Sequence, residues 1–179
     1  RDEIRRVVAW WLRIADVRPA GAVTGGWQRW LQLVKAAQTR KRLALQAVSW
    51  HSPVNELVHH SGKARALTNG LALYDEGETM RHCIDGYRDD CINGTFLAFH
   101  VEFERDGKPR QATVGLVKRE HRFFKWQVSD VCGVANARFG REWPEIAKQL
   151  EGLCNVREMV RARREAARRA AMMQGVTWM

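Results

Sequence analysis

Residues 94–133 read GTFLAFHVEFERDGKPRQATVGLVKREHRFFKWQVSDVCG, and apolar side chains recur at every second position through much of this stretch. A period of two is typical of β-strands that bury one face. The pattern holds near residues 97–103, 112–116 and 124–128, and Asp106-Gly107 is a strong hairpin signal between the first two segments. We therefore expect three consecutive strands that form an antiparallel meander.

An amphipathic segment, residues 76–93, precedes these strands. Its apolar side chains, among them Met80, Ile84 and Cys91, fall on one stripe at helical spacing. Gly94 stands where a helix commonly ends. The sequence therefore predicts a central helix that leads into the sheet.

Helical periodicity also marks both flanks of this core. Apolar residues share one face in residues 4–14 and again in residues 27–34, and Ser52-Pro53 is typical of a helix start. Trp143-Pro144 opens a further helix toward the C-terminus. On that helix, arginines spaced by four, three and four residues form one stripe, namely Arg157, Arg161, Arg164 and Arg168.

These segments predict an α+β fold in one compact domain overall. We expect an N-terminal helical region in residues 1–70 and a C-terminal basic helix in residues 141–179. Between them, residues 71–140 are expected to form the core, a helix followed by a three-stranded antiparallel meander. A chain of 179 residues is long enough to bury such a core without disulfides or metals.

The chain carries a formal net charge of +10, which attracts anions over long range. We expect nucleic acid, either DNA or RNA, as the partner, although a solvated charged face is the alternative for any single cluster. Phe123, Trp126 and Trp143 lie near some of the cations in sequence and suggest stacking on bases. The candidate nucleic-acid-binding residues are Arg40, Lys41, Arg42, Lys118, Arg119, Arg122, Lys125, Arg157, Arg161, Arg164 and Arg168.

Composition argues against several other classes. No continuous apolar run reaches the length of a membrane span, so we expect no membrane partner. The four cysteines include no C-x-x-C pair, which indicates reduced thiols and a cytoplasmic setting rather than a disulfide framework or a zinc knuckle. We expect no cofactor and no metal, because we find no convincing carboxylate cluster. A metal-dependent nuclease that uses Glu76, Glu78 and Asp85 is a less favoured alternative.

The pair His82-Cys83 is the first candidate for chemistry. A thiolate near a helix N-terminus is stabilised by the helix dipole and by nearby cations, and Arg81 and His82 adjoin Cys83. Because Cys83 also falls on the apolar stripe, burial as a small hydrophobic side chain is the alternative.

Polar residues on and after the strands form a second candidate set, His100, Gln127, Asp130 and Asn136. In a regular strand, Gln127 and Asp130 would lie on opposite faces. Asp130 and Asn136 flank the point where the chain leaves the sheet. Turn chemistry is therefore an equally good explanation for both, since Asp and Asn satisfy loop backbone groups.

With these residues identified, the segment from Leu71 to Asn136 resembles the PcfJ-like family of conjugative plasmids, phages and other bacterial mobile elements. The resemblance implies a mobile-element or phage-conflict setting, other components of a larger bacterial complex as partners, and no settled reaction. Family members tend to carry glutamine where this chain has Asp130. The matching residues are Glu76-Gly77, Met80-x-His82-Cys83-Ile84-x-Gly86-Tyr87, Gly94, Ala112-Thr113-Val114 and Gly133-x-x-Asn136.

Three functions are then in competition. The first is a nucleic-acid-binding module. The second is an enzyme acting on nucleic acid or a nucleotide, with Cys83 as nucleophile, His82 or His100 as proton shuttle, and Asn136 as orienting group or oxyanion donor. The third is a protein-interaction adaptor whose basic helix binds an acidic partner. Convergence of the candidate residues in one cleft would favour the enzyme.

Overall fold

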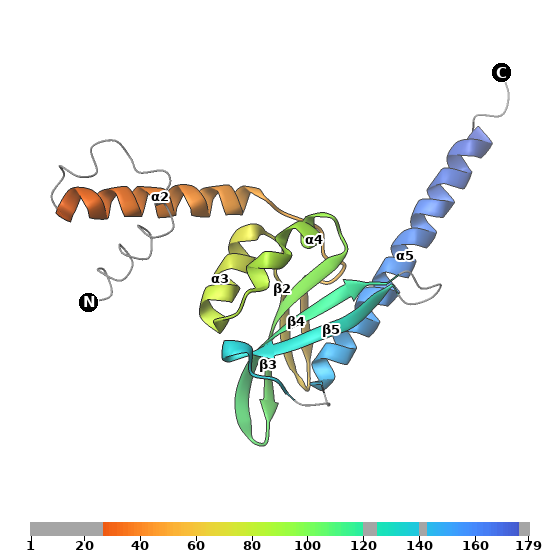
Figure 1. Ribbon diagram of the computed structural model, residues 1–179. Helices are drawn as coiled ribbons and strands as arrows, with labels where there is room; N and C mark the ends of the chain where they lie inside the picture. Colours follow the sequence, from red (N-terminus) through yellow and green to blue (C-terminus); the bar gives the residue numbers. More distant parts are fainter. Residues whose placement is uncertain (1–26, 120–124, 140–142, 176–179) are drawn as a thin grey trace. The chain divides into compact units, whose positions relative to one another are not determined.

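The computed structural model describes residues 27–119, 125–139 and 143–175 (Figure 1). The chain divides into two compact units, residues 1–46 and residues 47–179. The helix expected near residues 4–14 lies outside the described residues. The helix expected near residues 27–34 is present as α2, Trp27–Ala47.

The second unit is built on a five-stranded antiparallel sheet in the order β1-β2-β3-β4-β5. The α+β class is confirmed, but the three-stranded meander is wrong, because β2 pairs with the outer edge of β3 and β1 pairs with β2. The strands are β1 (Glu56–His59), β2 (Gly62–Ala66), β3 (Phe96–Arg105), β4 (Lys108–Lys118) and β5 (Trp126–Gly133).

The strands β1 and β2 correct the prediction of helices throughout residues 1–70. Ser52 does not cap a helix, since its hydroxyl donates to the carbonyl of Val54 at 2.6 Å. The turn that follows β1 depends on Gly62, which has a φ of 147°, and a Cβ there would collide with the carbonyl oxygen of Glu102. Only Ala64 is fully buried in β2, so these short strands carry little hydrophobic alternation.

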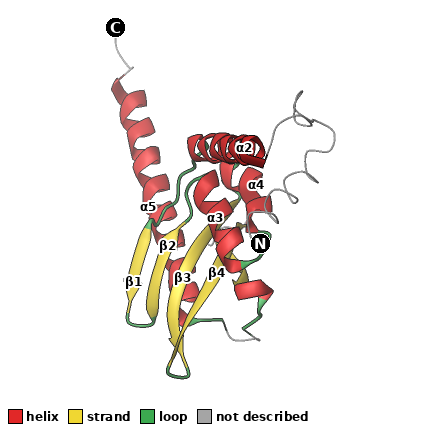
Figure 2. Cartoon of the chain, turned by 90° about the vertical axis from the view of Figure 1, so that its left-hand side faces the viewer, coloured by secondary structure: helices red, strands yellow, loops and turns green. Residues whose placement is uncertain are grey.

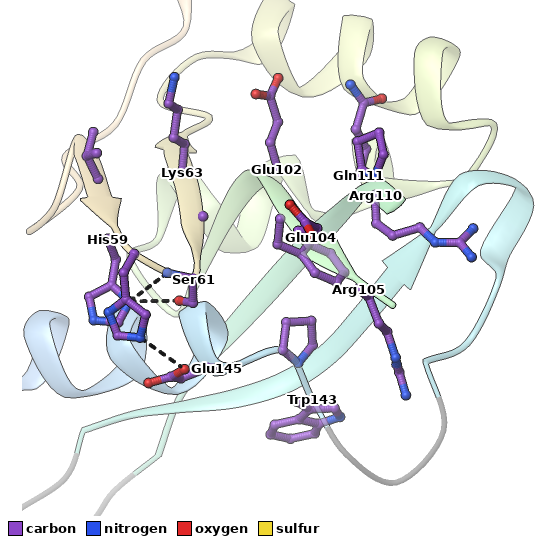
Figure 3. Close-up of a pocket in the computed structure, with 16 residues that line it drawn as sticks. His59, Ser61, Lys63, Glu102, Glu104, Arg105, Arg110, Gln111, Trp143 and Glu145 are labelled. Carbon is purple, nitrogen blue, oxygen red and sulfur yellow. Dashed lines mark hydrogen bonds and ion pairs between the residues drawn. The ribbon is translucent and has the colours of Figure 1, made fainter. Parts of the chain in front are cut away.

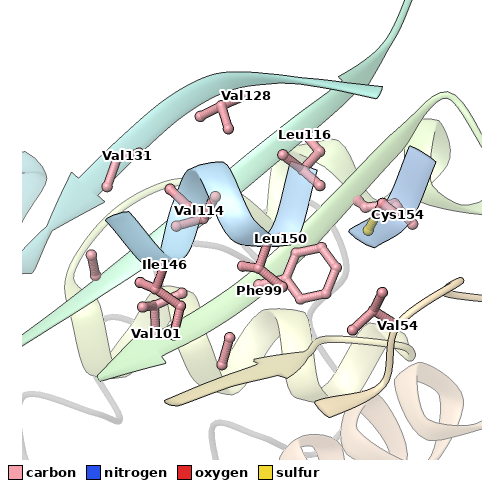
Figure 4. Packing of buried hydrophobic residues seen from close by; sticks show 14 of the residues in the cluster. Val54, Phe99, Val101, Val114, Leu116, Val128, Val131, Ile146, Leu150 and Cys154 are labelled. Carbon is pink, nitrogen blue, oxygen red and sulfur yellow. The ribbon is translucent and has the colours of Figure 1, made fainter. Parts of the chain in front are cut away.

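One face of the sheet packs against α5, Glu145–Gly175. Phe99 and Val114 from the sheet meet Ile146 and Leu150 from the helix in the larger hydrophobic core (Figure 4). The predicted C-terminal helix is therefore present, and its first part is held by apolar burial. From residue 159 to residue 170 every residue of α5 is exposed.

The opposite face of the sheet carries α3 (Gly70–Met80), the 3₁₀ helix η1 (Ile84–Tyr87) and α4 (Arg88–Ile92) (Figure 2). Leu73, Ile84 and Cys91 pack there against Phe96 in a second, smaller core. The sheet is thus the middle layer between α5 and the short helices.

The single central helix expected over residues 76–93 is wrong. Asn69 caps α3 by accepting the backbone N–H of Ala72, so the helix begins before the predicted segment. It ends at Arg81, which has a left-handed φ of 57°, and the N–H of His82 bonds back to the carbonyl of Gly77. The chain then turns, and η1 and α4 follow as separate short helices.

Among the described residues, none of the helices combines the length and the apolar character that crossing a membrane requires.

Asn155 joins α5 to the start of β5. Its side-chain oxygen accepts the backbone N–H groups of Lys125 and Trp126, both at 2.9 Å, and its amide donates to the carbonyls of Trp126 and Glu151. We expect Asn155→Ala to lower the free energy of unfolding by about 2–3 kcal/mol, because buried backbone groups lose their partners. Urea denaturation measures this loss. Gln149→Ala, an exposed change in the same helix, is the control and should leave the unfolding free energy nearly unchanged.

Candidate functional site

A cleft of about 90 Å³ opens on the sheet face that carries α3 and η1. Four of the five predicted catalytic residues line this polar cleft, so the structure brings them together, whereas His100 is not among its lining residues. The lining residues are His82, Cys83, Ile84, Tyr87, Phe96, Thr113, Gly115, Ser129, Asp130, Cys132 and Asn136.

The turn after α3 places His82 and Cys83 in the lining of the cleft. The left-handed residue Arg81 reverses the chain, and Gly77 gives it room, since a Cβ on Gly77 would lie 3.0 Å from the carbonyl oxygen of His82. Cys83 immediately precedes the four-residue η1 and does not lie in the expected helix. Cys83 is the N-cap residue of η1, so its thiol still lies at a helix N-terminus, although that helix is much shorter than the sequence predicted.

A β-bulge in β5 places Asp130 in the lining of the cleft. Gly115 pairs with Asp130 and Leu116 pairs with Val128, so Ser129 is the extra residue, and its hydroxyl donates to the carbonyl of Gly115 at 3.1 Å. Paired residues share one face of a sheet, and Asp130 consequently faces the cleft with Gly115. The bulge thus places Gln127 and Asp130 on the same face, where a regular strand would separate them.

Asn136 reaches the cleft from η2, Val134–Asn136, which follows β5 directly. Ala135 and Asn136 both adopt left-handed φ values, 56° and 60°. Asn tolerates this conformation, but Ala does so at a cost of about 1–2 kcal/mol. Backbone strain of this kind is concentrated at functional sites, and here it orients a cleft residue.

A buried carboxylate, Glu76, lies beneath the cleft with its side chain 5% exposed. It accepts a short hydrogen bond from the hydroxyl of Thr113, and His100 Nδ1 lies 3.0 and 2.9 Å from its two oxygens. His82 Nε2 lies 2.7 Å from the same hydroxyl oxygen. Because the single hydroxyl proton goes to Glu76, His82 must donate through Nε2, which leaves Nδ1 as the proton acceptor of its ring.

His100 is a partner of Glu76 and is not a cleft residue. The hydrogen bond to Glu76 is the main cause that raises the pKa of His100 above 6.5, and burial opposes it. The imidazolium and the carboxylate therefore form a half-buried pair that ties β3 to α3. The sequence placed His100 on the strand face opposite the main apolar residues, and in the structure its ring bonds to Glu76 of α3 and does not line the cleft.

The four cysteines differ in their environments. Burial raises the pKa of Cys91 and of Cys154 to about 12. Burial, followed by a hydrogen bond from its thiol to Asp130, raises the pKa of Cys132 to about 11. These three thiols are protonated at neutral pH. Cys83 is exposed on the cleft, so the alternative of a buried Cys83 is wrong, and Cys83 is the accessible thiol of the site.

The predicted cationic residues fall in two places. Lys118, Arg119 and Lys125 flank the end of β4 and the start of β5, which Asn155 fastens to α5. The arginine stripe continues along α5 from that junction. We call these residues together with Arg157, Arg161, Arg164 and Arg168 the basic surface. Arg40, Lys41 and Arg42 are exposed on α2, in the other unit, and Arg122 lies outside the described residues.

Some of these cations are already engaged. Arg161 pairs with Glu158 at 3.0 Å and with Glu165 at 3.6 Å, and Arg157 donates to the carbonyl of Pro53. In the described part of the chain, Arg164 and Arg168 make no ion pair. The arginines toward the end of α5 are therefore the ones open to a ligand.

The structure also groups residues that the sequence did not single out. His59, His60 and Glu145 each offer one ligand atom, and these atoms lie within 4.8 Å of one another. In the sequence, the adjacent pair His59-His60 was the only indication of this group, because Glu145 is far away along the chain and only the fold brings it close.

Comparison with known proteins adds no identification. No protein-family model, curated protein or solved structure matches this chain. The resemblance to the PcfJ-like family stays a prediction, and the function has to be argued from the geometry above.

The His100–Glu76 pair makes stability depend on pH. Because folding raises the pKa of His100, its stabilisation is fully present below about pH 6.5 and is lost as the pH rises through the folded-state pKa. We expect the unfolding free energy of the wild type to fall over that window and that of His100→Gln to fall less. Urea denaturation across the window, with His51→Gln as the exposed control, measures the difference. Parallel curves for wild type and His100→Gln would contradict the assignment.

Proposed function

We propose that this chain is a nucleic-acid-binding module that contacts phosphates through its basic surface, in the cytoplasm and in a mobile-element or phage-conflict setting. The observation that carries the proposal is the fully exposed stretch of α5 from residue 159 to residue 170, which holds Arg164 and Arg168 without ion pairs among the described residues. Guanidinium groups bind phosphate oxygens in a bidentate manner and stay charged at any physiological pH.

The hydrogen bonds of Asn155 support the proposal, because they hold the start of β5 against α5. Lys118 and Lys125 at the sheet end adjoin the middle of α5 through the Asn155 hydrogen bonds, so the cations extend from the sheet onto the helix. Stacking on bases receives less support. Of the three aromatic residues expected to stack, Trp126 is buried in the core, and Phe123 lies outside the described residues. Trp143 is exposed, but it precedes α5 at the end opposite to Arg164 and Arg168. We accordingly propose backbone contacts with little sequence preference.

Salt dependence tests this proposal. Each phosphate that a cation neutralises contributes about −0.9 to the slope of log K against log salt for duplex DNA and about −0.7 for single strands. We expect Arg164→Ala/Arg168→Ala to weaken binding of labelled DNA and RNA oligonucleotides and to reduce the magnitude of the slope by about 1.5. Fluorescence anisotropy titrations at several salt concentrations provide the measurement.

Lys108→Ala/Arg110→Ala is the matched control, since it removes the same charge from an exposed hairpin that lies near the start of α5 and not near Arg164 and Arg168. It should retain most of the affinity and the slope. Equal effects of the two double variants would show that only net charge matters. Absence of binding at low salt, together with copurification of an acidic protein, would replace the proposal by the adaptor function.

A second function has a specific observation in its favour, which is the convergence of His82, Cys83, Asp130 and Asn136 in the polar cleft. We propose for this cleft a Cys/His-dependent reaction on nucleic acid or a nucleotide. The sulfur of Cys83 attacks a phosphorus atom of the substrate while His82 accepts the thiol proton at Nδ1. The bond from phosphorus to the leaving oxygen breaks, His82 returns the proton to that oxygen, and water then hydrolyses the phosphocysteine. Thr113 fixes the ring tautomer of His82, while Asn136 orients the substrate or donates to a developing oxyanion.

Substitutions in the cleft test the reaction. Labelled single-stranded DNA, RNA and nucleoside triphosphates are incubated with the chain, and turnover or covalent adducts are followed by gel and mass spectrometry. We expect Cys83→Ser to abolish adduct formation and His82→Ala to slow the reaction by about 10²–10⁴-fold. His51→Ala, an exposed histidine away from the cleft, is the control. Full activity of Cys83→Ser would refute the covalent step.

A further inference from the structure

A second cavity, of about 1000 Å³, lies where the β1–β2 turn, the β3–β4 hairpin and the start of α5 meet (Figure 3). His59 is the last residue of β1, His60 is the first residue of the turn that follows, and Glu145 is the first residue of α5. The fold therefore brings together three potential ligands that are separated in sequence.

The three side chains already converge. His60 Nε2 lies 3.6 Å from Glu145 Oε2, and the rings of His59 and His60 have centroids 3.9 Å apart. Bond lengths of 2.0–2.2 Å to zinc place neighbouring ligand atoms about 3.4 Å apart in a tetrahedral site. The three ligand atoms here lie within 4.8 Å of one another. Small rotations of the exposed side chains of His60 and Glu145 are therefore enough to reach that geometry.

Ser61 holds the imidazole ring of His59 in place through contacts with Nδ1. The hydroxyl of Ser61 lies 2.7 Å from His59 Nδ1 (Figure 3). The backbone N–H of Ser61 also donates to Nδ1, at 3.3 Å, so Zn²⁺ binding at Nε2 requires the ring proton to move to Nδ1, where the hydroxyl of Ser61 can accept it. Histidine ligands commonly hold their second ring nitrogen in this way, which fixes the tautomer and orients the ring.

We propose that His59, His60 and Glu145 bind a Zn²⁺ ion. Two imidazoles and one carboxylate suit a borderline divalent metal such as Zn²⁺, whereas Mg²⁺ prefers oxygen ligands and retains its waters. Three protein ligands leave the fourth position to a water or a substrate group, for which the adjoining cavity has room. The cluster is also open to solvent, so the ion exchanges readily.

The proposed metal site is separate from the polar cleft, because none of its three ligand residues lines that cleft. Among the described residues, the group of His59, His60 and Glu145 is the only one with three potential ligands within this distance. The proposal is also independent of nucleic-acid binding and of the cleft reaction, because none of its residues belongs to the basic surface or to the cleft.

Isothermal titration calorimetry with ZnCl₂ tests the proposal. To exclude thiol ligation, the titrations are made in a Cys83→Ser/Cys132→Ser background. We expect one Zn²⁺ per chain, and His60→Ala or Glu145→Gln should weaken the affinity by at least about tenfold. Glu145→Gln preserves the shape of the side chain at the start of α5, so that loss of affinity is not loss of fold. His51→Ala, which removes an exposed histidine elsewhere, should bind as the parent does.

Two further readouts make the test decisive. Zn²⁺ should raise the melting temperature of the parent and not that of Glu145→Gln, since an ion that binds only the folded state stabilises it. MgCl₂ should give no heat of binding. Absence of Zn²⁺ binding, or equal affinities for the parent, His60→Ala and Glu145→Gln, would overturn the proposal.

Discussion

The buried carboxylate of Glu76 is the constraint on which the rest of the site depends. A charge removed from water is tolerated only when hydrogen bonds and an opposite charge replace its hydration. Thr113 and His100 supply both, from two neighbouring strands, so α3 has one position on the sheet at which this carboxylate is satisfied. The same hydroxyl then fixes the ring of His82. A single buried anion thereby couples the placement of a helix to the protonation pattern of a residue in the polar cleft.

The cleft is shaped by three departures from regular backbone. Arg81 ends α3 in a left-handed conformation, the extra residue Ser129 rotates Asp130 onto the cleft face, and Asn136 completes a left-handed pair after β5. Each departure costs free energy locally, and each one redirects a polar side chain toward the same place. The local backbone strain lowers stability at these points and orients the side chains that line the cleft.

Periodicity in the sequence predicted what the regular elements show. The strands around residues 97–103 and 112–116 alternate strictly, and the structure forms both. The sequence did not predict β1 and β2, because these strands have only four and five residues and their side chains do not alternate between apolar and polar. The prediction of one helix over residues 76–93 was wrong, because no sequence signal indicates that Arg81 adopts a left-handed conformation and ends α3. Residue types identified His82, Cys83, Asp130 and Asn136, but not the link through Thr113, which depends on contacts between residues far apart in the chain.

The layered arrangement separates the two surfaces. α5 packs on one face of the sheet and the polar cleft opens on the other, while β5 is the edge strand that both adjoin. A polymer held along α5 can enter the cleft only by turning sharply around that edge. Duplex DNA, with a persistence length of about 150 base pairs, is too stiff for such a turn, whereas an unpaired strand bends within a few nucleotides. For the proposed nucleic-acid ligand, this layered arrangement would favour an unpaired strand over a duplex in reaching the cleft.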